Sequence, residues 1–220
     1  MHVRCSTRAH GDFHVEQPFE RLEATRRAFV DLPWSQPDEV HGTDVSVVTS
    51  PGEHDLDVAD ALVTDLAGAV LGIWVGDCAP VAFEGAGGRI GVAHAGWRGL
   101  LDGVLARTVE VMRVGVDDRT VRAVLGPCIH PCCYEFGTDD LARVVDRFGP
   151  GVVGRTRDGR PALDVPAAVA AALSELDVEV RPALTGPTCT GCDPEHRWFS
   201  HRVRAERGRQ VMAVWKDPER

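Results

Sequence analysis

The first half of the chain alternates short apolar runs with segments rich in Asp and Gly. The runs are rich in Val and Ile and have the length of strands, so each is predicted to be a β-strand. They cover Val45–Thr49, Ala59–Thr64, Val70–Val75, Pro80–Phe83 and Ile90–Ala93. This part of the chain is therefore predicted to build a β-sheet.

Helical spacing of apolar residues marks other segments. The clearest helix opens at Leu100, where apolar residues recur up to Met112 and Asp102 lies in a first turn that favours negative charge. A short helix is predicted over residues 19–30, a second over Asp139–Phe148, and an alanine-rich one over Pro166–Leu176, with proline at its tolerated first position.

Further strands are predicted at Val121–Leu125, Val178–Val180 and Gln210–Trp215, and Gly149–Gly159 is expected to be a glycine-rich connection. Helices and strands are interleaved without strict βαβ order. This pattern favours an α/β fold of layered, α+β character, with a mixed β-sheet flanked by helices. We expect residues 1–220 to form a single domain.

Composition and charge exclude several classes of protein. The chain has 220 residues, 44% of them apolar, and a net charge of −9, which argues against nucleic-acid binding. No apolar run approaches the length of a membrane span, and the N-terminus has no signal-peptide core. A cytoplasmic protein without a membrane partner is expected.

The stretch Arg89–Gly99 carries the strongest sign of chemistry. Its strand ends at His94, and a turn with Trp97 and Arg98 leads into the helix. Functional groups of open α/β sheets gather at the carboxyl ends of strands, so an imidazole, an indole and a guanidinium are expected around one site.

Two further residues share this placement at a strand boundary. His41 precedes one strand, and Cys78 interrupts two apolar runs. Together with His94 they make three ligands, the number that leaves a catalytic zinc one open position. The same residues also fit a cysteine enzyme in which Cys78 is the nucleophile, His94 or His41 is the base and Asp77 orients the imidazole. They could also be three unrelated residues of the core.

The chain contains seven cysteines, an odd number that argues against a disulfide framework in a reducing compartment. Cysteines between 128 and 133 could join Cys189 and Cys192 in a structural zinc site of four thiolates. The first group lacks a true CxxC spacing and is flanked by prolines, which favours a shaped loop instead. Prolines near Cys189 and Cys192 also discourage a thioredoxin-like motif.

Arginines and aromatic residues supply candidates for substrate binding. Guanidinium groups match phosphate, and Arg98, Arg202 and Arg197 are the candidates, whereas Arg204, Arg207 and Arg209 are expected on a solvated face. Residues that could stack on a planar base are Trp97, Tyr134, Trp198 and Phe199, although core packing explains each of them better.

Several separate motifs resemble, in order, those of the bacterial laccase-domain family, also called the purine nucleoside phosphorylase or peptidoglycan editing factor family and formerly the polyphenol oxidase family. The resemblance runs from about residue 40 to the C-terminus. Its motifs are Val40-His41-Gly42, Ala59–Thr64, Asp77–Val81, Ala93–Gly99, Gly126–Glu135, Cys189-Thr190 and Phe199–Arg202.

The resemblance implies a fold shared with cysteine hydrolases related to cytotoxic necrotizing factor. It implies one zinc held by His41, Cys78 and His94, phosphorolysis of adenosine, inosine and methylthioadenosine, and adenosine deamination as a side activity. Copper-dependent polyphenol oxidation and editing of peptidoglycan precursors are the other activities attached to the family. Glu39 departs from the family pattern, which often has Gln there, and the segment from Asp12 to Glu20 is shortened.

These observations favour a zinc enzyme that binds a purine nucleoside and phosphate. The catalytic residues would be Cys78, His94 and His41, with substrate bound by Arg98, Arg202 and Tyr134. Copper could compete for the same ligands, but nine histidines without a His-x-His pair do not favour a multicopper oxidase. A cysteine amidohydrolase acting on peptidoglycan precursors, a polyphenol oxidase and a non-enzymatic metal-binding protein are the alternatives, and the oligomeric state is left open.

Overall fold

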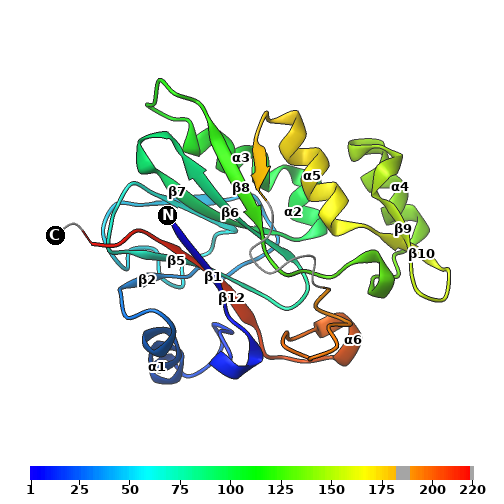
Figure 1. The fold of residues 1–220 in the computed structure, drawn as a ribbon, viewed down its shortest axis with the longest axis horizontal. Helices are drawn as coiled ribbons and strands as arrows, with labels where there is room; N and C mark the ends of the chain where they lie inside the picture. Colours follow the sequence, from blue (N-terminus) through cyan, green and yellow to red (C-terminus); the bar gives the residue numbers. More distant parts are fainter. Residues whose placement is uncertain (182–188, 219–220) are drawn as a thin grey trace.

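A six-stranded mixed sheet forms the centre of the computed structural model, which describes residues 1–181 and 189–218 (Figure 1). Its strand order is β11-β8-β6-β7-β4-β3. The pairs β3–β4 and β8–β11 are parallel and the other pairs are antiparallel. The strands are β3 (Val45–Val48), β4 (Ala61–Thr64), β6 (Ala79–Gly85), β7 (Ile90–Ala95), β8 (Val121–Leu125) and β11 (Glu179–Arg181).

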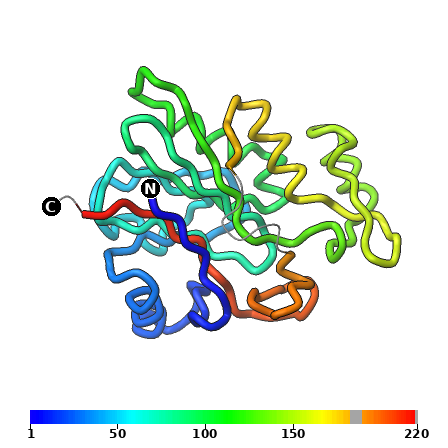
Figure 2. The backbone as a smooth tube through the Cα atoms, in the orientation of Figure 1, coloured from blue at the N-terminus to red at the C-terminus, as the bar shows by residue number. Residues whose placement is uncertain are grey.

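A second sheet has four strands in the order β1-β12-β5-β2. Its members are β1 (His2–Cys5), β2 (Trp34–Ser35), β5 (Val70–Val75) and β12 (Gln210–Trp215). Figure 2 shows β1 and β12 side by side, so the two ends of the chain meet in this sheet. The prediction placed all strands in one mixed sheet, because an apolar run does not specify which sheet it joins.

The helices are α1 (Phe19–Phe29), α2 (Trp97–Asp102), α3 (Val104–Met112), α4 (Thr138–Phe148), α5 (Val165–Glu175) and α6 (His201–Arg204). Helices α2 to α5 lie on one side of the six-stranded sheet, and α1 lies at the far side of the four-stranded sheet (Figure 1). Alternate residues of β5 face opposite ways: Leu71 and Ile73 pack between the sheets, whereas Val70 packs beneath α1. The mixed α/β arrangement is thus confirmed.

The helix predicted from Leu100 is two helices. The first already begins at Trp97, and Asp102 ends it instead of lying in a first turn. Gly103 separates the two with φ +94°, a conformation that other residues rarely adopt. Trp97 and Arg98 therefore lie on a short helix of their own, separate from α3.

The predicted connection Gly149–Gly159 contains part of a hairpin. Strands β9 (Val153–Arg155) and β10 (Pro161–Leu163) pair antiparallel, and Gly154 lies so close to Pro131 that a Cβ there would fall 2.3 Å from the ring.

Among the described residues, no helix is long and apolar enough to cross a membrane. The single domain and the likeness to cysteine hydrolases stay predictions.

Candidate metal centre

His94 lies near the end of β7 and is buried between two acidic side chains. Its Nδ1 is 2.8 Å from Oδ1 of Asp60 and 3.3 Å from Oε2 of Glu39. A hydrogen bond from Nδ1–H to a carboxylate fixes the tautomer and leaves Nε2 free to bind a metal. The fold therefore presents His94 as an oriented ligand.

Asp60 also shapes the loop that carries His41. Its carboxylate accepts backbone N–H groups from His41 at 2.9 Å, from Gly42 at 2.6 Å and from Val40 at 3.3 Å. These bonds hold His41 at φ +62°, a backbone conformation that a histidine rarely adopts. One buried carboxylate thus positions both imidazoles.

The three predicted ligands converge. The donor atoms of His41, Cys78 and His94 all lie within 4.8 Å of one another, and Nε2 of His41 is 3.8 Å from the Cys78 sulfur. The histidine rings meet edge to face with centroids 4.7 Å apart. Gly96 closes the back of the group, because a Cβ there would fall 2.7 Å from the His41 ring.

Electrostatics at the site favour a thiolate. Burial raises the pKa of Cys78, but the imidazoles of His94 and His41 outweigh it and lower the pKa to about 6. Burial lowers the pKa of His94, but Glu39, the Cys78 sulfur and Asp60 raise it well above its ordinary value. Burial also raises the pKa of Glu39 well above its ordinary value.

This donor set fits zinc. Two imidazole nitrogens and one thiolate match the three protein ligands of catalytic zinc sites, and all three residues line a cavity. Copper binds the same donors more tightly in general, so the ligands alone do not select the metal.

The cavity above the three ligands has a volume of about 380 Å³, which is within the usual range for small-molecule sites. The predicted substrate residues Arg98, Arg202 and Tyr134 all line it. The Arg98 guanidinium lies over Trp97 at 4.5 Å and that of Arg202 over Tyr134 at 4.8 Å, measured to the ring centroids. Cationic groups and aromatic faces therefore share one cavity with the three candidate ligands.

Several expectations fail on geometry. The carboxylate that orients the imidazole is Asp60, because Asp77 instead accepts bonds from Thr190, Ser200 and the backbone of Arg202. Arg197, a predicted anion ligand, is paired with Asp193 through two nitrogens.

Trp198 is buried in the core, as the core-packing interpretation predicted, and Phe199 packs against the guanidinium of Arg8. The predicted position of one arginine is wrong. Arg204 does not lie on a solvated face, because it donates to the backbone carbonyls of Thr190, Gly191 and Trp198.

The sequence alone did not assign five residues of this region to the site, and it placed one of them, Arg209, on a solvated face. Asp60 and Glu39 bond His94, while Trp74, His201 and Arg209 line the cavity. A lone carboxylate directly before an apolar strand was a usable signal for Asp60, since a buried charge needs partners. Nothing in the local sequence marked Trp74 or separated Arg209 from its neighbouring arginines.

Four of the remaining cysteines meet elsewhere. The sulfurs of Cys132, Cys133, Cys189 and Cys192 lie within 4.8 Å of one another, and none of these residues lines the cavity. Cys128, also considered as a ligand, is buried and pairs with Cys189 only through the backbone. The proline-flanked segment predicted a loop rather than a group of thiols, but in the structure this segment brings Cys132 and Cys133 close to Cys189 and Cys192.

Comparison with known proteins identifies the family of the chain. Residues 9–217 match the family described as "Multi-copper polyphenol oxidoreductase laccase". The "Purine nucleoside phosphorylase" of Xylella fastidiosa (strain 9a5c) is 37% identical over 184 residues, which are 80% of this chain and 70% of that protein. "Purine nucleoside phosphorylase ORF3" of Streptomyces griseus is 37% identical over 183 residues, 81% of this chain and 72% of that protein.

Solved structures show the same fold. Neisseria meningitidis protein NMB0706, assigned to DUF152, superposes with a TM-score of 0.78 at 28% identity and covers 94% of this chain and 86% of that one. YlmD from Geobacillus stearothermophilus gives 0.77 at 26% identity, over 98% and 91% of the two chains. The chain therefore belongs to the laccase-domain family.

Proposed function

We propose that the protein is a zinc-dependent purine nucleoside phosphorylase that acts on adenosine, inosine and methylthioadenosine, with adenosine deamination as a side activity. The observation that carries the proposal is the shared cavity, in which the ligands His41, Cys78 and His94 face arginines and aromatic rings. Relatives named purine nucleoside phosphorylase support it.

His41, Cys78 and His94 would hold the zinc, with Asp60 and Glu39 orienting His94 from behind. When bound, zinc supplies Lewis acidity at the floor of the cavity. The thiolate of Cys78 balances part of its charge.

Phosphate would bind to Arg98 and Arg202, which lie at the cavity and carry no ion pair among the described residues. Each guanidinium lies over an aromatic ring, an arrangement that leaves N–H donors at the guanidinium edge for phosphate oxygens. Burial raises the pKa of Tyr134 to about 12, so its hydroxyl keeps its proton and can donate to a substrate.

Phosphorolysis then breaks the bond between the purine N9 and C1′ of the ribose and forms a bond from a phosphate oxygen to C1′. The purine leaves with the bonding electron pair and takes up one proton, which gives free base and ribose 1-phosphate. The arginines hold the phosphate in line with C1′, so that its attack becomes effectively unimolecular.

A direct assay follows adenosine with and without inorganic phosphate, together with the zinc content of the dialysed protein. We expect adenine release that requires phosphate. Arg98→Ala should raise KM for phosphate about tenfold, since a charge-assisted hydrogen bond contributes about 1.5 kcal/mol or more. Arg122→Ala is the matched control, because Arg122 pairs with Glu179 outside the cavity.

Adenine release at the same rate without phosphate would contradict phosphorolysis, whereas inosine formed without phosphate is the product of the deaminase side activity. Unchanged phosphate dependence in Arg98→Ala would remove Arg98 from the site.

One observation favours a second candidate, a cysteine amidohydrolase acting on peptidoglycan precursors. Cys78 has a pKa of about 6 and lies 3.8 Å from the His41 imidazole, which is the arrangement of an activated thiolate beside a base. The two candidates differ in metal dependence. Amide hydrolysis retained after complete removal of zinc would favour the thiolate mechanism, and loss of activity that zinc restores would favour the metal enzyme.

A copper polyphenol oxidase is less well supported by the donor atoms. The two groups of potential metal ligands in residues 1–181 and 189–218 contain only two histidines between them. Oxidation of a phenol by the copper-loaded protein, measured beside the zinc form, distinguishes this activity from adventitious copper binding. A protein that binds zinc but converts none of these substrates would be the non-enzymatic alternative.

A further inference from the structure

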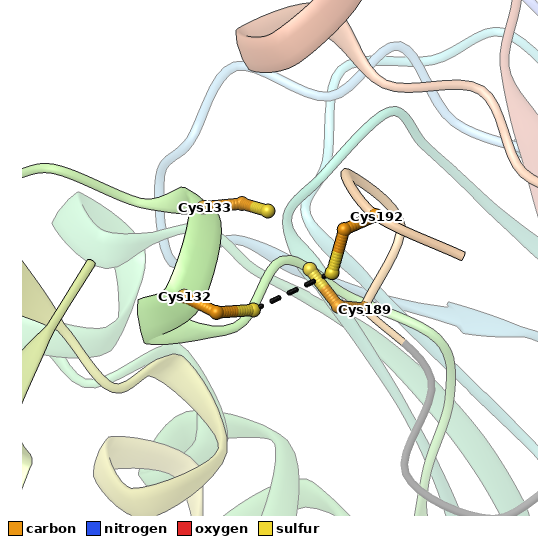
Figure 3. A group of neighbouring side chains, drawn as sticks. All are labelled: Cys132, Cys133, Cys189 and Cys192. Carbon is orange, nitrogen blue, oxygen red and sulfur yellow. Dashed lines mark hydrogen bonds between the residues drawn. The ribbon is translucent and has the colours of Figure 1, made fainter. Parts of the chain in front are cut away.

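Four thiols from two distant parts of the chain converge beside α6. Cys132 and Cys133 lie on the short 3₁₀ helix Pro131–Cys133, and Cys189 and Cys192 lie on the loop before α6. Figure 3 shows their side chains pointing toward one another across the gap between these segments. All four sulfurs lie within 4.8 Å of each other, and the Cys132 and Cys192 sulfurs are 3.5 Å apart.

These separations fit one metal ion. Four sulfurs at the usual zinc–sulfur distance of about 2.3 Å form a tetrahedron with edges of about 3.8 Å. A disulfide requires sulfurs about 2.05 Å apart and would use two of the four thiols. The observed group therefore has the number and spacing of donors of a metal site.

The backbone at Cys189 favours a charged sulfur. The N–H of His130 donates to the Cys189 sulfur at 3.4 Å. Such N–H donors stabilise thiolate, which is the form that binds a metal. Arg204 adds positive charge nearby by donating to the carbonyls of Thr190 and Gly191.

Close packing holds the two segments together at this point. A Cβ on Gly191 would fall 2.9 Å from Cβ of Cys133 and 2.7 Å from Val203, so only glycine permits the approach. A backbone hydrogen bond also holds the loop in place: the N–H of Thr190 donates to the carbonyl of Cys128 at 3.0 Å. The thiols are thus brought together by the backbone as well as by their side chains.

We propose that Cys132, Cys133, Cys189 and Cys192 bind a second, structural zinc ion. Four protein ligands leave no open position, so this ion would stabilise the fold and take no part in the reaction. It would join chain segments 60 residues apart. One segment continues into Tyr134 and the other leads to Arg202, so the ion would brace the wall of the cavity.

The proposal does not depend on the proposed activity, and metal content tests it directly. The full chain is purified reduced from zinc-supplemented cells, dialysed against metal-free buffer and analysed for metal per chain. We expect two zinc ions in the wild type, one in Cys78→Ala and one in Cys192→Ser. Cys5→Ser is the matched control and should keep two, because Cys5 belongs to neither group of ligands.

X-ray absorption distinguishes the two sites. The zinc remaining in Cys78→Ala should be surrounded by four sulfurs, and the zinc remaining in Cys192→Ser by nitrogen and sulfur. Cobalt substituted into Cys78→Ala should give the intense absorption bands of a tetrahedral tetrathiolate. These spectra need only the folded Cys78→Ala protein, so the test stands even where Cys192→Ser does not fold.

Three results would overturn the proposal. Folded Cys78→Ala protein without metal is the first, and iron instead of zinc on the four sulfurs is the second. The third is a Cys132–Cys192 disulfide, found by mass spectrometry in protein that lacks the second zinc.

Discussion

Replacing Asp60 by asparagine tests whether one buried carboxylate organises the metal centre. Asp60 accepts four hydrogen bonds: Oδ1 bonds the His94 ring and the N–H of His41, and Oδ2 bonds the N–H groups of Gly42 and Val40. Asparagine has the same shape but keeps only one of the two oxygens. Its NH₂ group therefore faces two donors that lose their acceptor.

The magnitude follows from these contacts. A buried donor left without a partner costs about 1–3 kcal/mol, so two such groups lower the free energy of unfolding by about 2–4 kcal/mol in this partly accessible loop. Loss of a carboxylate behind a metal-binding histidine typically lowers metal affinity about 10- to 100-fold, or about 1.4–2.7 kcal/mol. Both effects are expected in Asp60→Asn.

The assay is zinc affinity by competition with a chromophoric chelator, with chemical denaturation measured on the same preparations. Asp65→Asn is the matched control: Asp65 flanks the other end of strand β4, and its carboxylate pairs with Arg89 at the surface. We expect a less than threefold change of zinc affinity there. Wild-type zinc affinity in folded Asp60→Asn would refute the role of Asp60 in orienting His94.

Three further predictions concern packing and charge. Gly96→Ala should weaken zinc binding at the first site about tenfold or more, because its Cβ would fall 2.7 Å from the His41 ring. Gly137→Ala, with open space around the new Cβ, should bind zinc as the wild type does, and equal affinities in both variants would contradict this. Leu105→Ala should lower the free energy of unfolding by about 2–5 kcal/mol in denaturant titrations, because the side chain is buried beneath the sheet; a change below 1 kcal/mol would contradict its place in the core. Although burial raises the pKa of Glu206, hydrogen bonds from the Ser200 backbone and two arginines lower it below its ordinary value of 4.5. As the pH falls below 4.5, the Glu206 carboxylate is therefore protonated first in the unfolded chain, which lowers the free energy of unfolding. Below this pH, the free energy of unfolding should fall more steeply in the wild type than in Glu206→Gln. Parallel plots of unfolding free energy against pH would count against the ion pairs of Glu206.

The hydrophobic pattern alone located most of the strands and helices, because burial imposes a period of two or of 3.6 residues on the local sequence. It predicted α1, α4 and α5 and strands β3 to β8 within a few residues. It missed β1 and β2, which are short and become strands only by pairing with β12 and β5. It also merged α2 with α3, because it did not take account of the positive φ of Gly103.

The residue types and their placement at strand ends indicated His41, Cys78 and His94 as one site, and the structure brings them together. The residues behind them were not predictable in the same way. Glu39 and Asp60 contact His94 from other segments of the chain, and only the folded sheet places them there.

The sequence by itself determined most of the helices and strands, the family and the grouping of His41, Cys78 and His94 as candidate ligands. Each of these depends on local periodicity, on a motif of adjacent residues or on placement at a strand boundary. The tertiary structure decided the division of the strands among three sheets and the convergence of four thiols at a second candidate site. It also decided which arginines reach the cavity: Arg197 and Arg204 satisfy their hydrogen bonds elsewhere, whereas Arg98 and Arg202 line it. These outcomes depend on contacts between residues far apart in the chain, and no local pattern encodes such contacts.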